Sequence, residues 1–213
     1  DTVLDAGANV GIFSLLASQK CSRVLAVEPD PLNYFYLVKN IELNKAENII
    51  PINSALSDYI GSGFISGRGL SAALSQCGIP ITVTTIDKLL EDLKLGKIDV
   101  VKMDIEGSEV KAINGRYLQT VRELIVESHS KSGYSVVCEI LGREAFRITE
   151  WSLSYFRVLK RIIENLTDFV SSELKTGFVA SKLLFNYIFG LSGHPVPAAN
   201  KESEIKLIYA KHG

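Results

Sequence analysis

The first residues that could do chemistry lie almost at the start of the chain, in the stretch TVLDAGANVG (residues 2–11). Its apolar beginning and its glycines predict a short buried strand that passes through a tight turn into a helix beginning near Ile12. In an α/β protein this arrangement places backbone N–H groups and a helix N-terminus around a ligand at the carboxyl end of the first strand. The stretch therefore predicts a cofactor site.

Carboxylates follow two further predicted strands. Glu28 ends a strand at 23–27, and an ionised carboxylate there could accept two hydrogen bonds from a pair of ribose hydroxyls. Asp104 ends the apolar run 98–103, where an ionisable residue is costly unless it has a role. We therefore expect Glu28 in the cofactor site and Asp104 in the active site.

Glu106 and His129 are the candidates for proton transfer with Asp104, since His129 lies just past a predicted strand and histidine is a frequent general base. Both also have an ordinary interpretation. Acidic residues such as Glu106 and Glu109 complement the dipole of a helix in its first turn, and a loop histidine is often a polar surface group. A divalent metal bridging Asp104, Glu106 and a substrate is chemically compatible with these residues, but no His/Asp spacing requires it, so no metal is predicted.

The elements that must position these residues alternate between strands and helices. Asp30 and Pro31 fit the N-cap and the first position of a helix that ends near Asn44. The alternation predicts a parallel sheet with right-handed crossovers. Besides those already named, strands are predicted at 48–53, 123–127, 145–151 and 205–210, and helices at 12–18, 88–93 and 134–143, with Thr85 or Asp87 capping the second of these.

Two segments interrupt the alternation. Residues 61–78 are rich in Gly and Ser, and we interpret them as a mobile loop and candidate lid with one short strand at Phe64-Ile65 that pairs with 81–85. Residues 152–191 have the periodicity of an amphipathic helix followed by a more apolar one. If the strands at 145–151 and 205–210 form a hairpin, these helices are an insertion. Core packing or a substrate cap is favoured over a dimer contact or peripheral membrane attachment.

The composition limits the class of protein. The 213 residues are 46% hydrophobic and carry a net charge of −1, which suits one domain with a full core and argues against a dedicated nucleic-acid binder. Three widely separated cysteines without metal-ligand spacing, and no signal peptide or membrane-spanning run, favour a cytoplasmic setting. The first residue is Asp and lies directly against the first strand, so we expect an upstream segment.

The residues alone leave two cofactor classes open. The dinucleotide pattern G-x-G-x-x-G needs a middle glycine that lets the backbone approach a pyrophosphate. This chain has Gly7 and Gly11 with Asn9 between them, and Asn tolerates left-handed backbone angles well enough for a tight turn. Glu28 suits the ribose of NAD and of S-adenosylmethionine equally.

Four motifs in register narrow the choice: DAGANVG (5–11), EPD (28–30), NSALSD (53–58) and VKMDIEGSE (101–109). Over roughly residues 1–130 the chain resembles the FkbM-type family of S-adenosylmethionine-dependent methyltransferases, and TID (85–87) and ESH (127–129) are in keeping with it. The resemblance implies a class I methyltransferase fold, a doubly wound, Rossmann-like, mostly parallel seven-stranded sheet whose last strand is antiparallel. It also implies O-methylation of a hydroxyl on a small molecule or glycan.

The resemblance assigns roles to individual residues. The turn would hold the amino-acid end of the cofactor, Glu28 would bind the ribose, and the loop at 53–55 would border the adenine. Asp104 would lie under the methionine portion, near the transferred methyl group. The cofactor-binding residues are thus expected to be Asp5, Gly7, Ala8, Asn9, Gly11, Glu28, Pro29, Asp30, Ser54, Ala55 and Asp104, and the catalytic ones Asp104, Glu106 and His129. A nicotinamide-dependent oxidoreductase and a non-catalytic cofactor-binding or membrane-surface module are the alternatives.

Overall fold

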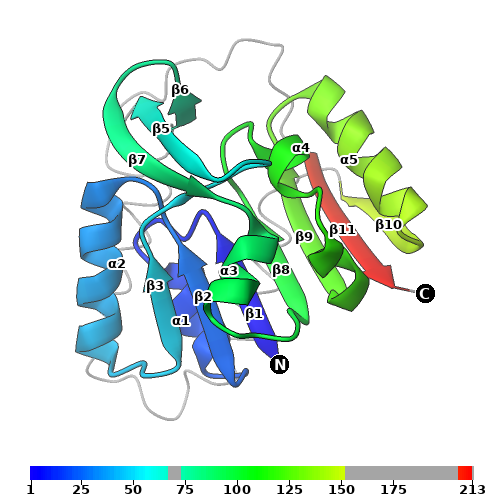
Figure 1. Cartoon of the computed structure of the whole chain (residues 1–213). Coiled ribbons are helices and arrows are strands. Elements are labelled where there is room, and N and C mark those ends of the chain that lie inside the picture. Colours follow the sequence, from blue (N-terminus) through cyan, green and yellow to red (C-terminus); the bar gives the residue numbers. More distant parts are fainter. Residues whose placement is uncertain (67–72, 152–205, 213) are drawn as a thin grey trace, which may run out of the picture. The chain divides into compact units, whose positions relative to one another are not determined.

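The computed structural model describes residues 1–66, 73–151 and 206–212 (Figure 1). The chain divides into two compact units, and all described residues belong to the first, Asp1–Trp151 with Ile205–Gly213. The helices predicted at 152–191 lie outside the described residues. Within the described part of the chain, no helix is long and apolar enough to cross a bilayer.

The larger sheet of the described residues has seven strands in the order β10-β11-β9-β8-β1-β2-β3. Neighbouring strands are parallel except at β11, which runs antiparallel to both β9 and β10. This confirms the predicted sheet, including the hairpin of the last two strands. Its strands are β1 (Thr2–Ala6), β2 (Arg23–Val27), β3 (Ile49–Ile52), β8 (Val100–Met103), β9 (Glu123–Ser128), β10 (Phe146–Trp151) and β11 (Lys206–His212).

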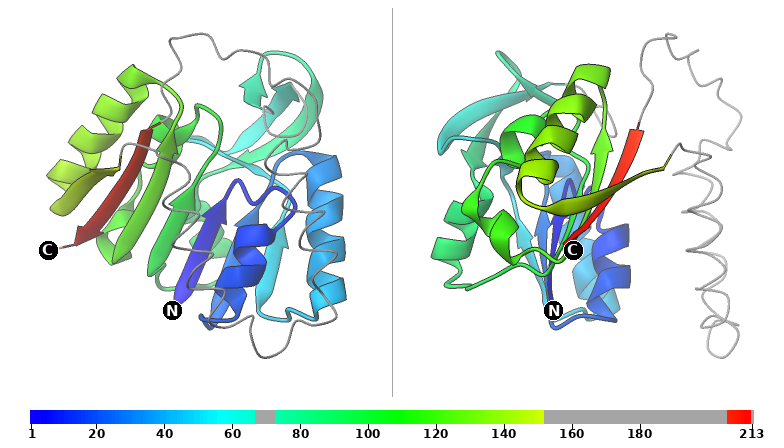
Figure 2. Two further views of the ribbon diagram at one scale, coloured as in Figure 1. Left: turned by 180° about the vertical axis from the view of Figure 1, so that it is seen from behind. Right: turned by 90° about the vertical axis from the view of Figure 1, so that its right-hand side faces the viewer.

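Helices cover both faces of this sheet. Successive strand residues point to opposite sides, so each strand contributes to two hydrophobic cores. Val3 and Val24 pack with residues of the first two helices, whereas Leu4 and Leu25 belong to a second core with residues of the later helices. The two covered faces make the sheet doubly wound (Figure 2). The helices are α1 (Ile12–Ser18), α2 (Pro31–Asn44), α3 (Ile86–Asp92), α4 (Glu109–Ala112) and α5 (Lys131–Arg143), with a 3-10 turn at Arg116–Thr120.

Local signals set most helix starts. Asp30 accepts hydrogen bonds from the backbone N–H groups of Leu32 and Asn33 at 2.8 and 3.0 Å, which confirms it as the N-cap of α2. Thr85 caps α3, so that helix begins at Ile86 rather than at 88. Ser130 caps α5 through the N–H of Gly133, which moves its start from the predicted 134 to Lys131.

The Gly/Ser-rich segment differs from its prediction. It contributes to a second sheet of four strands in the described residues, in the order β4-β7-β5-β6. The predicted pairing exists as β5 against β7, but Ile65 lies opposite Ile79. The glycines obscured the alternation of apolar and polar residues that predicts strands. In the structure these strands bury a small core of Ala55, Ile65, Ile81 and Val83. The strands are β4 (Ala55–Leu56), β5 (Gly61–Ser66), β6 (Ala73–Ser75) and β7 (Ile79–Thr84).

Candidate functional site

The turn after β1 fits the end of β8 closely. Gly7, Asn9 and Gly11 have φ angles of 79°, 52° and 90°, which glycine and asparagine tolerate best. A Cβ atom on Gly7 would lie 1.8 Å from the carbonyl oxygen of Asp104. Only glycine therefore allows the turn to lie against the residue that follows β8.

The N–H groups of this turn are used within the protein. Asn9 donates to Oε2 of Glu28 at 2.8 Å, and Gly11 donates to the carbonyl of Ala8 at 2.8 Å. Gly7 and Ala8 both donate to Val27, and Val10 donates to the side chain of Asn9. This differs from the expectation that the turn presents its N–H groups to a ligand. It leaves no donor among these five for a pyrophosphate, which needs such groups.

Glu28 ties the turn to the start of α2. Besides Asn9, it accepts the backbone N–H of Asp30 at 3.0 Å and the side-chain amide of Asn33 at 3.4 Å. The carboxylate is buried, which raises the pKa of Glu28 despite these hydrogen bonds. Because a carboxylate has about four lone-pair positions, it retains capacity for a ribose hydroxyl. Its role as a ribose ligand stays a prediction.

The other predicted cofactor residues hold the loops around Glu28. Asn53 donates its amide to the carbonyls of Glu28 and Pro29 at 2.8 and 3.2 Å. Ser54 is buried and donates to the carbonyl of Thr82 at 3.1 Å, while Ala55 begins β4. Asn53 thereby ties the loop before the second sheet to the end of β2.

Asp5 is fully buried in β1, and its carboxylate already has partners. Ser14 donates to it at 2.6 Å, and the ammonium of Lys102, its neighbour in register on β8, lies 3.1 Å away. Lys102 also donates to the carbonyl of Gly7 at 2.8 Å and lies 4.0 Å from Asp104. Asp5 thus acts on the turn through Lys102.

Sequence reasoning assigns no role to Lys102, although a lysine inside an otherwise apolar strand was a usable signal. Burial alone would lower its pKa, but the carboxylates of Asp5, Asp104 and Glu127 outweigh burial and raise it. Lys102 is therefore a permanent positive charge between the turn and the end of β8.

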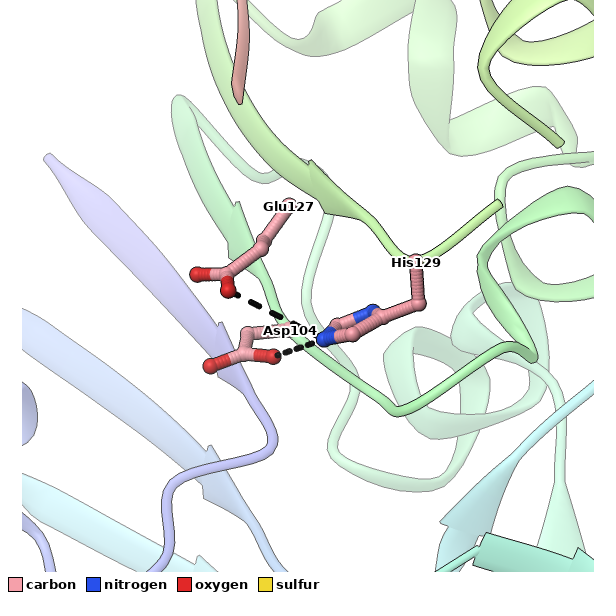
Figure 3. Close-up of side chains that lie close together, drawn as sticks. All are labelled: Asp104, Glu127 and His129. Atoms are coloured by element: carbon pink, nitrogen blue, oxygen red, sulfur yellow. Dashed lines mark ion pairs between the residues drawn. The ribbon is translucent and has the colours of Figure 1, made fainter. Parts of the chain in front are cut away.

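Four carboxylates surround His129 at the ends of β8 and β9. Its Nε2 lies 3.6 Å from Asp104 and 3.8 Å from Glu127 (Figure 3). Glu106 approaches the same nitrogen at 3.5 Å. The structure thus brings together the predicted catalytic residues Asp104, Glu106 and His129. It adds Glu127, which sequence reasoning missed although, like Asp104, it is an acidic residue at the end of an apolar strand.

Glu109 fixes the orientation of the His129 ring. Its buried carboxylate lies 2.8 Å from Nδ1 and also accepts the N–H of Gly107. Burial opposes ionisation of Glu109, but these hydrogen bonds outweigh it and lower the pKa. An ionised carboxylate only accepts, so Nδ1 is the donor and Nε2 faces the other three carboxylates.

The surroundings raise the pKa values of three groups in the cluster. Burial alone would lower the pKa of His129, but Glu109, Glu106 and Asp104 raise it to about 9. Burial and the charge of Asp104 raise the pKa of Glu127 to about 7. Burial likewise raises the pKa of Glu106. At neutral pH His129 is therefore a cation, and Glu127 is close to half protonated.

Ligand atoms of Asp104, Glu127 and His129 lie within 4.8 Å of one another, a spacing that would admit a divalent cation. Such an ion would have to replace the proton on His129, because a protonated imidazole has no lone pair for a metal. The prediction that no metal is needed stays a prediction.

The chain is similar in sequence to known methyltransferases. Residues 5–152 match the family described as the Methyltransferase FkbM domain. Methyltransferase sdnD from Sordaria araneosa is 27% identical over 205 residues, which cover 74% of this chain and 79% of the relative. Hexuronic acid methyltransferase AglP from Haloferax volcanii is 30% identical over 137 residues, which cover 61% of this chain and 56% of the relative.

Among solved structures, Methyltransferase FkbM from Methylobacillus flagellatus KT has a similar fold, with a TM-score of 0.52 and 20% identity over 70% of this chain and 39% of that one. The chain thus spans about half the length of AglP and less of the crystallised protein.

Proposed function

Because the chain belongs to the FkbM methyltransferase domain family, with S-adenosylmethionine as its methyl donor, we propose that it methylates a hydroxyl group of a small molecule or glycan. One observation carries the proposal: the turn after β1 adjoins the acidic cluster. Gly7 packs against the carbonyl of Asp104, and Lys102 contacts both Gly7 and Asp104. A donor held at the turn would have its reactive end near Asp104.

The residues present fit this donor better than a dinucleotide. The turn has no free N–H group among residues 7–11 for a pyrophosphate, whereas Glu28 retains capacity for a ribose hydroxyl. The bound donor supplies a methyl group made electrophilic by a positively charged sulfur. We assign the ribose to Glu28 with Pro29 and Asp30, the adenine to the loop at 53–55, and the methionine portion to the turn and Asp104.

The acidic cluster supports a hydroxyl acceptor. Methyl transfer needs the attacking oxygen held in line with the departing sulfur, and a hydroxyl must also lose its proton. Asp104 and Glu106, with side chains 34% exposed, are placed to accept hydrogen bonds from an acceptor. His129 offsets part of their negative charge. The name of AglP gives a sugar acid as its substrate, which supports a glycan acceptor for this chain. A cytoplasmic setting without a nucleic-acid partner stays our expectation.

The test follows the methyl group. Calorimetry with S-adenosylmethionine and with NAD should show binding of the first alone. Tritiated methyl groups should then enter metabolites below about 3 kDa in a cell extract, in products that resist mild base, as ethers do and esters do not. Binding of NAD alone would overturn the assignment of S-adenosylmethionine as the donor. Products that mild base cleaves would overturn the assignment of a hydroxyl as the acceptor.

Asp104→Asn should bind the donor but lose about 100-fold in transfer rate, because it removes an acceptor group beside the reacting atoms. Asp92→Asn, on the exposed face of α3, is the matched control and should keep the wild-type rate. Undiminished transfer by Asp104→Asn would remove Asp104 from the mechanism.

A further inference from the structure

We propose that Glu127, rather than His129, accepts the proton of the substrate hydroxyl. The proposal rests on the proposed function and names a residue of the same site. Glu127 lies next to Asp104 because Met103 and Val126, the residues before them, are partners in the β8–β9 register. Its side chain is 17% exposed, and its Oε1 lies 3.8 Å from Nε2 of His129. The two carboxylates and the imidazole converge on one point (Figure 3).

His129 is poorly suited to accept a proton. Its Nδ1 donates to the buried Glu109, and its Nε2 faces Asp104, Glu106 and Glu127 at 3.5 to 3.8 Å. Four neighbouring carboxylates stabilise the charged ring, and a general base needs a free lone pair. The imidazole therefore acts as a fixed positive charge in the cluster.

The other carboxylates are committed or more exposed. Glu109 holds the ring of His129, and Asp104 and Glu106 are twice as exposed to water as Glu127. In the described part of the chain, the Glu127 carboxylate makes no hydrogen bond, so its lone pairs remain available. It is thus a shielded acceptor beside the predicted position of the methyl group.

The charges that face Glu127 set its proton affinity near neutrality. Lys102 and His129 favour its ionised form, while Asp104, Glu106 and burial oppose it, and the pKa rises to about 7. On the adjacent β11, Lys206 lies opposite Ser128 in register, so its side chain projects from the other face of the sheet than that of Glu127, and its ammonium lies 4.3 Å from the centroid of the Tyr134 ring. A general base works best when its pKa lies near the working pH, because much of it is then ionised and still binds a proton well.

The step balances without a further reactant. The hydroxyl proton passes to a Glu127 oxygen, and the electron pair of the hydroxyl oxygen forms the new C–O bond. The C–S bond breaks, and its electron pair stays on sulfur. The products are a methyl ether, a neutral thioether and a protonated Glu127, which then loses its proton to water.

The test is the pH dependence of methyl transfer from tritiated S-adenosylmethionine into the small-metabolite fraction of a cell extract, at acceptor levels where the initial rate follows kcat/KM. In the wild type the rate should fall below a pH of about 7, as Glu127 becomes protonated. Glu127→Gln should lower the rate about 100-fold or more and abolish this acid limb. Donor affinity by calorimetry should not change. Glu139→Gln, an exposed residue of α5, is the matched control.

His129→Gln separates the two candidate bases. Loss of the imidazolium should raise the pKa of Glu127, so the acid limb should move to higher pH and persist. If His129 were the base, the limb would vanish in this variant and remain in Glu127→Gln. A resonance of ¹³C-carboxyl-labelled glutamate that titrates near pH 7, absent from Glu127→Gln, reports the same group without any acceptor.

Three results would overturn the proposal. One is a Glu127→Gln enzyme within about threefold of the wild-type rate with its acid limb intact. The second is activity abolished by EDTA and restored by Mg²⁺, which would make the cluster a metal site. The third is donor binding without methyl transfer by the wild type, and this result would overturn the proposed function as well.

Discussion

The turn after β1 and the cluster around His129 are neighbours with opposite chemistry. In the turn, all five N–H groups are paired, and Asp5 and Glu28 are buried with hydrogen-bonding partners. In the cluster, three carboxylates lie 3.5 to 3.8 Å from Nε2 of His129, which is longer than a good hydrogen bond. The carboxylates there outnumber the positively charged groups. The difference indicates that the turn is a scaffold held in shape by its own hydrogen bonds, while the carboxylates of the cluster keep lone pairs that, under our proposal, meet a substrate hydroxyl.

The largest effect should follow from a side chain on the scaffold. Gly7→Ala places a Cβ atom 1.8 Å from the Asp104 carbonyl at a residue with a φ of 79°. We expect a loss of more than about 3 kcal/mol in the free energy of unfolding, or failure to fold. Chemical denaturation measures this. Gly142→Ala, in α5 with open space around it, should be neutral or stabilising, and equal effects of the two substitutions would contradict the close fit.

The buried Asp5–Lys102 pair should come next. Asp5→Asn removes the carboxylate that pairs with the Lys102 ammonium. We expect the free energy of unfolding to fall by about 3 kcal/mol, because breaking a buried ion pair leaves one charge without its partner. The double variant Asp5→Asn, Lys102→Met should recover part of that loss. A double-mutant cycle by urea denaturation measures the coupling, and additive losses would show that the two residues act independently.

The cluster should reveal itself through the pH dependence of stability. The folded pKa of His129, about 9, exceeds its ordinary value of 6.5, so its contribution to stability is complete below pH 6.5 and is lost as the pH rises through 9. Glu127, raised from 4.5 to about 7, acts with the same sign at lower pH. Unfolding free energies measured from pH 6 to 10 should therefore fall more steeply in the wild type than in His129→Gln. Parallel curves would contradict a protonated His129.

The smallest effect tests whether Asp30 belongs to the scaffold alone. Asp30→Ala removes the N-cap of α2 and should cost about 1 kcal/mol in unfolding free energy. Asp30→Asn keeps a capping oxygen and should stay close to the wild type. A large loss of donor affinity in Asp30→Asn, with stability kept, would instead assign Asp30 to the cofactor.

Much of the scaffold was predictable because its signals are local. A strand, a glycine turn and a helix follow one another within Thr2–Ala6 and Ile12–Ser18, and Asp30 with Pro31 marks the start of α2. Hydrophobic periodicity and capping depend on residues a few positions apart. The second sheet was missed because glycine and serine obscured the alternation around Ile65 and Ile81.

The sequence by itself determined the alternating fold, the turn and the identity of Asp104, Glu106 and His129 as groups at one edge of the sheet. Only the tertiary structure decided what these groups are to one another. Lys102 and Glu127 gain their roles from residues that directly follow neighbouring strands, Gly7 and Asp104, which lie 95 and 23 residues away along the chain. A pKa depends on burial and on charges within a few ångströms, which spacing along the chain does not specify. On our proposal, the fold thereby keeps His129 protonated and leaves Glu127 to accept the proton.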